Sequence, residues 1–324
     1  SGSTLYDQVT GNSGIQEWVL LYSGRYRIEA AGAEGGTSTE GAGGRGAILK
    51  GEFELTAGTT LFIAVGQQGL ASSYAGGGGG SFVAHGTSLS NSLPLIVAGG
   101  GASRGQGSGD VSSYLDASLT TSGRDGNQYG TAMYPSGGTG GNGGNGGTGY
   151  CPGGGGGGFY GNAIVNFTES GYLDNYGRAF RNGAIGGDFS SYDGGFGCGG
   201  AGYDNGGGGG GYSGGGAGSS SDSSYDRGGG GGGSYNLGEN TSDSSTLGYN
   251  YGNGYVTITC VNCNNFWPDI SSIDDQTTNE DTAISSISFT VTDVETADCG
   301  FDITFASSDT TVIPIENISY TCNS

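Results

Sequence analysis

Apolar and polar residues alternate along several short stretches of this chain. Tyr26, Ile28 and Ala30 are interrupted by Arg27 and Glu29, the period-two pattern of a strand with one buried and one wet face. Similar strands are predicted at Ala47–Leu55, Leu61–Val65 and Leu93–Ala98, and turn residues separate them. Since no segment carries a helical stripe, the pattern predicts an all-β fold, a β-sandwich.

Glycine blocks lie between the predicted strands, and glycine makes up 78 of the 324 residues. A flexible spacer is one interpretation. An ordered one is the polyglycine II helix, which has three residues per turn and no internal hydrogen bonds, so that such helices satisfy one another only by packing side by side. Aromatic residues and predicted strands flank the blocks, which favours a packed bundle. The blocks are Gly76–Gly80, Gly153–Gly158, Gly206–Gly211 and Gly228–Gly233.

The order of these motifs resembles the glycine-rich ectodomain of the anaplastic lymphoma kinase and leukocyte tyrosine kinase receptors. The similar segments are Ile15–Val19, Gly24–Gly36, Leu61–Gly69, Ala75–Val83, Leu93–Gly101, Gly194–Gly216 and Gly254–Cys260. The resemblance implies a tumour-necrosis-factor-like (TNF-like) β-sandwich with an inserted bundle of polyglycine II helices. In those receptors the region binds a small cytokine, and similar glycine honeycombs occur in adhesins of some bacteriophage tail fibres.

The composition changes near Phe266, where glycine gives way to Ser, Thr, Asp and Ile. We therefore expect an N-terminal extension at 1–14, the glycine-rich domain at 15–263 and a third segment at 264–324. The last resembles cadherin-like and immunoglobulin-like (Ig-like) tandem repeats of large secreted bacterial proteins. Only about 55 residues remain where such a sandwich needs about 100, so the module is expected to be partial. Either the chain is a fragment, or the stretch Ser3–Thr10 of another copy supplies a strand.

Six cysteines permit 15 connectivities. Nearness in sequence favours three pairs, Cys151 with Cys198, Cys260 with Cys263, and Cys299 with Cys322. Zinc is the alternative for Cys260 and Cys263, but it needs two further ligands and the only histidine, His85, is remote. Paired cysteines are typical of secreted proteins, which predicts an extracellular or cell-surface location.

Nine Lys and Arg stand against thirty Asp and Glu, a net charge of −21. Such a charge disfavours nucleic acid and anionic membranes as partners, and no apolar run approaches the 20 residues or so of a membrane span. One histidine and one lysine, His85 and Lys50, leave little material for a general base or an activated nucleophile. The sequence therefore predicts a protein that is not an enzyme and uses no organic cofactor.

Calcium binding and glycosylation are two further candidate features of the sequence. Acidic residues of the C-terminal module suit calcium between extracellular domains, although no loop has the spacing of a defined calcium motif and a solvated surface is the alternative. The candidates are Asp274, Asp275, Glu280, Asp281, Asp293 and Glu295. Glycosylation sequons begin at Asn166, Asn240 and Asn317, a number that chance also produces in a chain rich in Asn, Ser and Thr.

Two functional classes follow. The first is an extracellular structural or adhesive protein, a rigid glycine-rich scaffold that forms filaments if strands are donated between copies. The second is a receptor-type ectodomain or adhesin module that binds a protein or glycan. Expected partners are other copies, neighbouring extracellular domains or such a ligand. Tyrosines next to glycine, including Tyr74, Tyr150, Tyr160, Tyr203 and Tyr212, either seal the bundle or form a contact surface.

Overall fold

The computed structural model divides the chain into two compact units, Ser1–Asn262 and Cys263–Ser324, against a predicted boundary between 263 and 264. The described residues are 9–105, 112–166, 174–222, 227–239, 246–263, 269–279, 282, 284, 286–292 and 303–322.

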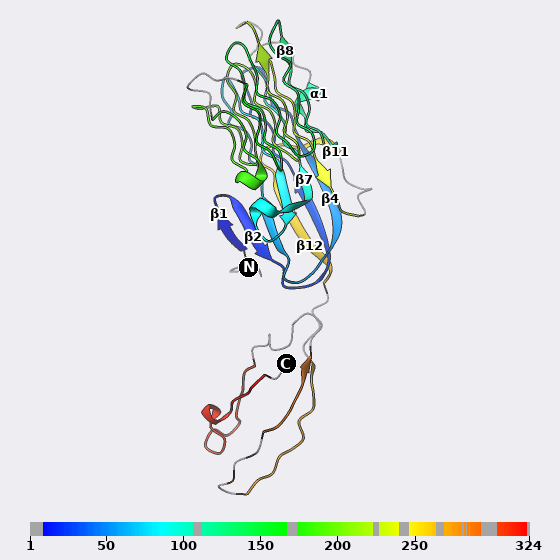
Figure 1. Ribbon diagram of the computed structural model, residues 1–324, viewed down its shortest axis with the longest axis vertical. Coiled ribbons are helices and arrows are strands. Elements are labelled where there is room, and N and C mark those ends of the chain that lie inside the picture. Colours follow the sequence, from blue (N-terminus) through cyan, green and yellow to red (C-terminus); the bar gives the residue numbers. More distant parts are fainter. Residues whose placement is uncertain are drawn as a thin grey trace. The chain divides into compact units, whose positions relative to one another are not determined.

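The all-β class predicted from the sequence is confirmed (Figure 1). In the described residues helical structure is confined to short turns, namely α1 (Ser112–Leu115), η1 (Leu89–Asn91), η2 (Phe180–Asn182) and η4 (Ile315–Asn317). The TNF-like topology stays an expectation.

The first unit contains a six-stranded sheet and a four-stranded sheet. The six-stranded sheet has the order β1 (Val9–Asn12), β2 (Ile15–Val19), β5 (Thr60–Ala64), β6 (Ser81–His85), β7 (Leu93–Ala98) and β10 (Tyr235–Asn236). The four-stranded sheet has the order β11 (Thr246–Asn250), β4 (Gly46–Leu55), β3 (Gly24–Ala31) and β12 (Tyr255–Cys263). Strand β3 contacts β6 and β7 of the other sheet and β4 contacts β7, which gives a sandwich-like core.

Opposite charges face one another on the outer side of β3 and β4. The register places Arg25 opposite Glu54, Arg27 opposite Glu52, and Glu29 opposite Lys50. Arg25 Nε lies 2.7 Å from Glu54 Oε1, Arg27 Nε 2.9 Å from Glu52 Oε1, and Lys50 Nζ 3.7 Å from Glu29 Oε2. We call these six residues the charge ladder. A shift of β3 by one residue against β4 would break every one of these pairs. The charge ladder therefore helps to fix the register between the two strands.

The predicted glycine bundle is confirmed by its hydrogen bonds, which repeat every three residues. In the block Gly206–Gly211, the amides of Gly206 and Gly209 donate to Arg227 O and Gly230 O, while those of Gly208 and Gly211 donate to Gly154 O and Gly157 O. The carbonyls of Gly206 and Gly209 accept from Gly218 and Gly215. Those of Gly207 and Gly210 accept from Ser103 and Gly100. Successive residues therefore bond to different neighbours around the block, as a helix with three residues per turn requires.

Glycine is needed in these blocks for space rather than for backbone conformation. No glycine of the four blocks has φ between +20° and +160°. A Cβ on Gly208 would overlap Gly215 O and lie 2.8 Å from Gly156 N, and one on Gly209 would overlap Gly100 O. Only residues without a side chain let backbones approach so closely on every side.

Buried serines complete the lattice where it meets other segments. Ser103 Oγ accepts the amide of Gly207 at 2.9 Å and donates to Ala75 O. Ser213 Oγ accepts from Gly141 N at 3.1 Å and donates to Thr121 O at 2.6 Å. Each hydroxyl thus satisfies a buried amide and a carbonyl together, which spares the cost of unpaired polar groups.

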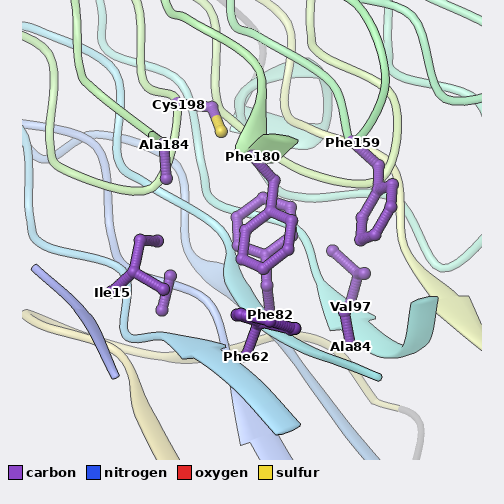
Figure 2. Packing of buried hydrophobic residues seen from close by; sticks show 10 residues of the cluster. Ile15, Phe62, Phe82, Ala84, Val97, Phe159, Phe180, Ala184 and Cys198 are labelled. Carbon is purple, nitrogen blue, oxygen red and sulfur yellow. The ribbon is translucent and has the colours of Figure 1, made fainter. Parts of the chain in front are cut away.

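Aromatic residues follow every glycine block and meet at the junction of bundle and sandwich. Phe82, Phe159, Tyr212 and Tyr235 come directly after the blocks or one serine later. With Phe180 they form a contiguous cluster, in which ring centroids are 4.8 Å apart for Phe82 and Phe180 and 4.7 Å for Tyr212 and Tyr235. Figure 2 shows Phe82, Phe159 and Phe180 gathered there. The prediction that some tyrosines seal the bundle holds for Tyr212.

In the described part of the second unit, β13 (Asp269–Ile270) pairs antiparallel with β14 (Val291–Thr292) in a small sheet. None of its described residues is buried, and Ile270, Ile273 and Val312 are among its exposed large side chains. That this segment is a partial cadherin-like or Ig-like module stays a prediction. Residues 9 and 10 of the expected donor stretch belong to β1 and pair with Trp18 and Glu17 of β2, so they are bonded within the first unit.

Candidate functional site: an aromatic patch at the distal end of the glycine bundle

Four aromatic side chains lie together at the end of the glycine bundle that points away from the sandwich, where Gly76–Gly80 and Gly206–Gly211 begin. They are Tyr74, Phe189, Tyr192 and Tyr203, and we call them the distal aromatic patch. Ring centroids are 5.2 Å apart for Tyr74 and Tyr192, 5.9 Å for Tyr74 and Tyr203, and 4.9 Å for Phe189 and Tyr203. All four side chains are half-buried, so ring surface stays open to a ligand.

Backbone hydrogen bonds fix the loops that carry the patch. Phe189 and Tyr192 lie in one turn, closed by a bond from Tyr192 N to Phe189 O and by Asp193 Oδ1, which accepts from Phe189 N at 2.8 Å. Gly202 N donates to Tyr192 O and Leu70 N donates to Asp193 O. The turn is thereby attached to the segments that carry Tyr203 and Tyr74, which holds the rings in one arrangement.

Asn205 joins the starts of three glycine blocks. Its Nδ2 donates to Tyr150 O at 2.8 Å and Cys151 O at 3.1 Å, and its Oδ1 accepts from Arg227 N at 2.8 Å. The side chain is 1% exposed. Beside it, Cys151 and Asp204 have φ of 41° and 35°, a left-handed conformation that costs non-glycine residues energy and persists only where neighbours enforce it. Asn205 supplies that constraint.

The surroundings of the patch are acidic. Asp188 is exposed, Asp193 is half-buried and Asp204 is buried. Combined with the net charge of −21, these carboxylates disfavour an anionic ligand. Flat aromatic faces edged by carboxylates suit ring-stacking with sugars, apolar contact with a protein, or cation–π contact with basic side chains.

The predicted pairing of Cys151 with Cys198 is wrong, because both are free thiols in the structure. Cys198 is buried beside Gly158 O, and Cys151 is half-buried at the other end of the same glycine block. Burial raises the pKa of Cys151 to about 11 and that of Cys198 well above its ordinary value of 9.0. Neither thiol is therefore a reactive nucleophile near neutral pH.

The other cysteines are bonded where the structure describes them. Cys260 and Cys263 form the predicted disulfide. Cys322 is also disulfide-bonded, while its predicted partner Cys299 lies outside the described residues.

These thiols predict a fall in stability at high pH. In the unfolded chain they ionise near 9, whereas the folded Cys151 thiol keeps its proton to about 11, so the unfolded state binds fewer protons in this window and stability falls as pH rises. For Cys151 we expect a loss of roughly 1 kcal/mol after allowance for solvent screening. Denaturant unfolding from pH 8 to 11 measures it. Cys151→Ser should flatten the decline, and an unchanged slope would contradict this assignment.

The predicted modification sites are only partly described. Asp274 and Asp275 are exposed, and Glu280, Asp281, Asp293 and Glu295 lie outside the described residues. The described part of the chain holds no group of three or more His, Cys, Asp or Glu side chains placed to bind a metal ion. Asn317 is exposed, Asn166 donates through Nδ2 to Gly146 O at 2.9 Å, and Asn240 is not described.

Sequence reasoning identified Tyr74 and Tyr203 as candidate contact residues but missed Phe189, Tyr192 and Asn205. For Asn205 the available signal was positional, since it stands directly before Gly206–Gly211, whereas no such signal marks Phe189 and Tyr192.

Comparisons with known proteins assign no family, since no protein-family model matches the chain and a search of curated proteins finds no match. No helix among the described residues combines the length and apolar character needed to cross a membrane.

Proposed function

We propose that the protein is an extracellular structural or adhesive module, in which the glycine bundle is a rigid support that presents the distal aromatic patch to a partner. The observation that carries this proposal is the position of Tyr74 and Tyr203 at the starts of hydrogen-bonded glycine blocks, with Tyr192 attached to both segments. A function in catalysis has no comparable support.

Rigidity supports the binding function. Every amide of Gly206–Gly211 donates to a neighbouring segment, so the distal loops are held by a lattice and not by side-chain packing alone. Rings that are already ordered lose little conformational entropy on binding, which strengthens association.

The chemistry of the patch indicates a neutral or basic partner, namely a glycan or a protein surface. Tyrosine supplies large, rigid rings with a polar end, and glycine, serine and asparagine around it supply backbone and amide hydrogen bonds. A receptor-type ectodomain that binds a protein ligand is the second candidate function. It is favoured by the same Tyr-, Ser- and Gly-rich loops, as in Gly187–Tyr192.

Adhesion of protein-coated beads tests the proposal. Beads carrying the whole chain are applied to a panel of immobilised neutral glycans and to cell-surface protein extracts. A double variant, Tyr74→Ser with Tyr192→Ser, should lower attachment about tenfold or more, because each lost aromatic contact is worth about 0.5–1.5 kcal/mol.

Tyr22→Ser is the matched control, because Tyr22 is an exposed tyrosine that precedes β3 in the sandwich. It should leave attachment unchanged. Circular dichroism and thermal unfolding confirm that the double variant is folded. Equal attachment of folded double variant and control would show that the patch is not the adhesive surface.

A further inference from the structure

In the described part of the first unit, the six-stranded and the four-stranded sheet end in the edge strands β1, β10, β11 and β12. Three of them carry features that discourage pairing with another chain. Strand β10 has two residues, β11 changes register between Thr246 and Asn250, and β1 has four residues, of which the last three are exposed and include Gly11. Short, irregular or polar edges make poor templates for a further strand.

Strand β12 lacks these features. It has nine residues and contains no charged residue, proline or glycine. Its first part alternates, with Tyr255, Thr257 and Thr259 exposed and Val256 and Ile258 half-buried. Among the described strands it pairs with β3 alone, so over Tyr255–Thr259 its other edge presents an uncharged row of backbone donors and acceptors.

The neighbouring charges do not oppose the approach of another copy. The charge ladder lies on β3 and β4, next to β12, and its three cations balance its three anions. Tyr255 of β12 donates from its hydroxyl to Glu29 Oε1 at 2.7 Å, which joins the exposed face of β12 to the ladder. In a protein of net charge −21, this locally neutral surface is suited to contact between copies.

We propose that β12 pairs antiparallel with β12 of a second copy, so that two four-stranded sheets join across a twofold axis. With the axis at Thr257, each Val256 lies opposite Ile258 of the other copy, and the two Thr257 side chains face each other. Apolar residues then meet on one face and threonines on the other, both favourable cross-strand pairs. A twofold interface requires a surface that is complementary to itself, and this uncharged segment meets that condition.

This proposal rests on the proposed structural function and gives a second copy of the chain as the partner in self-association. It does not depend on the distal aromatic patch. Bead attachment through the patch and dimerisation through β12 are measured separately, so the failure of one is distinguishable from the failure of the other.

Disulfide trapping tests the geometry. Residues directly opposite in an antiparallel pair have Cα atoms about 4.5–5.5 Å apart, within reach of a disulfide. Thr257→Cys, in a chain that also carries Cys151→Ser, should give a covalent dimer under mild oxidation that a reductant dissolves. Thr10→Cys on β1, in the same background, is the matched edge-strand control and should stay monomeric.

Sedimentation equilibrium of the unmodified chain gives the second measurement. Thr257→Lys should raise the dimer dissociation constant about tenfold or more, because like charges directly opposite are destabilising. Thr10→Lys should leave the dimer dissociation constant unchanged, although it changes the net charge by the same amount. A chain that is monomeric at its highest soluble concentration, with no trapping at Thr257→Cys, would overturn the proposal.

Removal of residues 1–8 separates this dimer from strand donation. Pairing through β12 does not use that segment, so the truncated chain should retain its dimer. Loss of association on truncation would overturn β12 pairing and support donation of the N-terminal stretch.

Discussion

Replacing Gly208 by alanine should destabilise the glycine bundle by about 3 kcal/mol or more, beyond the usual cost of overpacking, because the neighbours are backbone and cannot rotate away. A Cβ there would overlap Gly215 O and lie 2.8 Å from Gly156 N. Thermal unfolding gives the loss of stability. Hydrogen exchange should show faster amides throughout Gly206–Gly211, since displacing one block breaks the bonds that its neighbours share.

Gly11→Ala is the matched control for this experiment. Gly11 lies in β1, has no atom within 4 Å of an added Cβ and does not have a left-handed φ. The same substitution should therefore change stability little. If the two variants are equally stable, or if the glycine amides of the unmodified protein exchange freely, the packed lattice is wrong.

Replacing Asn205 by alanine should cost about 3 kcal/mol, because it removes three hydrogen bonds between a buried side chain and the backbone. The loss should also loosen the distal aromatic patch, since Asn205 fixes the segments at Tyr150, Cys151 and Arg227. Denaturant unfolding measures the first effect, and near-ultraviolet circular dichroism of the tyrosines reports the second.

Asn205→Asp separates hydrogen bonding from packing. The carboxylate fills the same volume and still accepts from Arg227 N, but it faces the carbonyls of Tyr150 and Cys151 with no donor. It should be at least as unstable as Asn205→Ala. Asn182→Ala, which removes an exposed amide bonded to Asn162 Oδ1 at 2.8 Å, should be nearly neutral. A stable Asn205→Asp would mean that the side chain only fills space.

The strands and glycine blocks could be predicted because their physical causes are local. Alternation at Tyr26–Ala30 reports one buried face, and that segment forms most of β3. A run such as Gly206–Gly211 between aromatic residues has few ordered conformations in which its backbone is satisfied. Both patterns are visible within a few residues, so they can be recognised without knowledge of the tertiary structure.

Other features depend on contacts between distant segments. Ser103 bonds to Gly207, and Asn205 bonds to Tyr150, so the roles of both follow from which blocks become neighbours. The wrong prediction of a disulfide between two of the cysteines has the same origin. Cys151 and Cys198 were paired by nearness in sequence, but one lies at the distal end of Gly153–Gly158 and the other beside Gly158. Phe189 and Tyr192 were missed because no local pattern distinguishes their turn from an ordinary loop.

The three-residue repeat of the hydrogen bonds restricts how the bundle could change in length. One extra glycine within Gly206–Gly211 would turn each following amide by about 120°, away from its acceptor and toward a different neighbour. Three extra glycines would return the following amides to their original directions and lengthen the block by about 9 Å. Insertions and deletions are therefore tolerated in whole turns, and neighbouring blocks must change together, so the height of the distal patch above the sandwich is set in discrete steps.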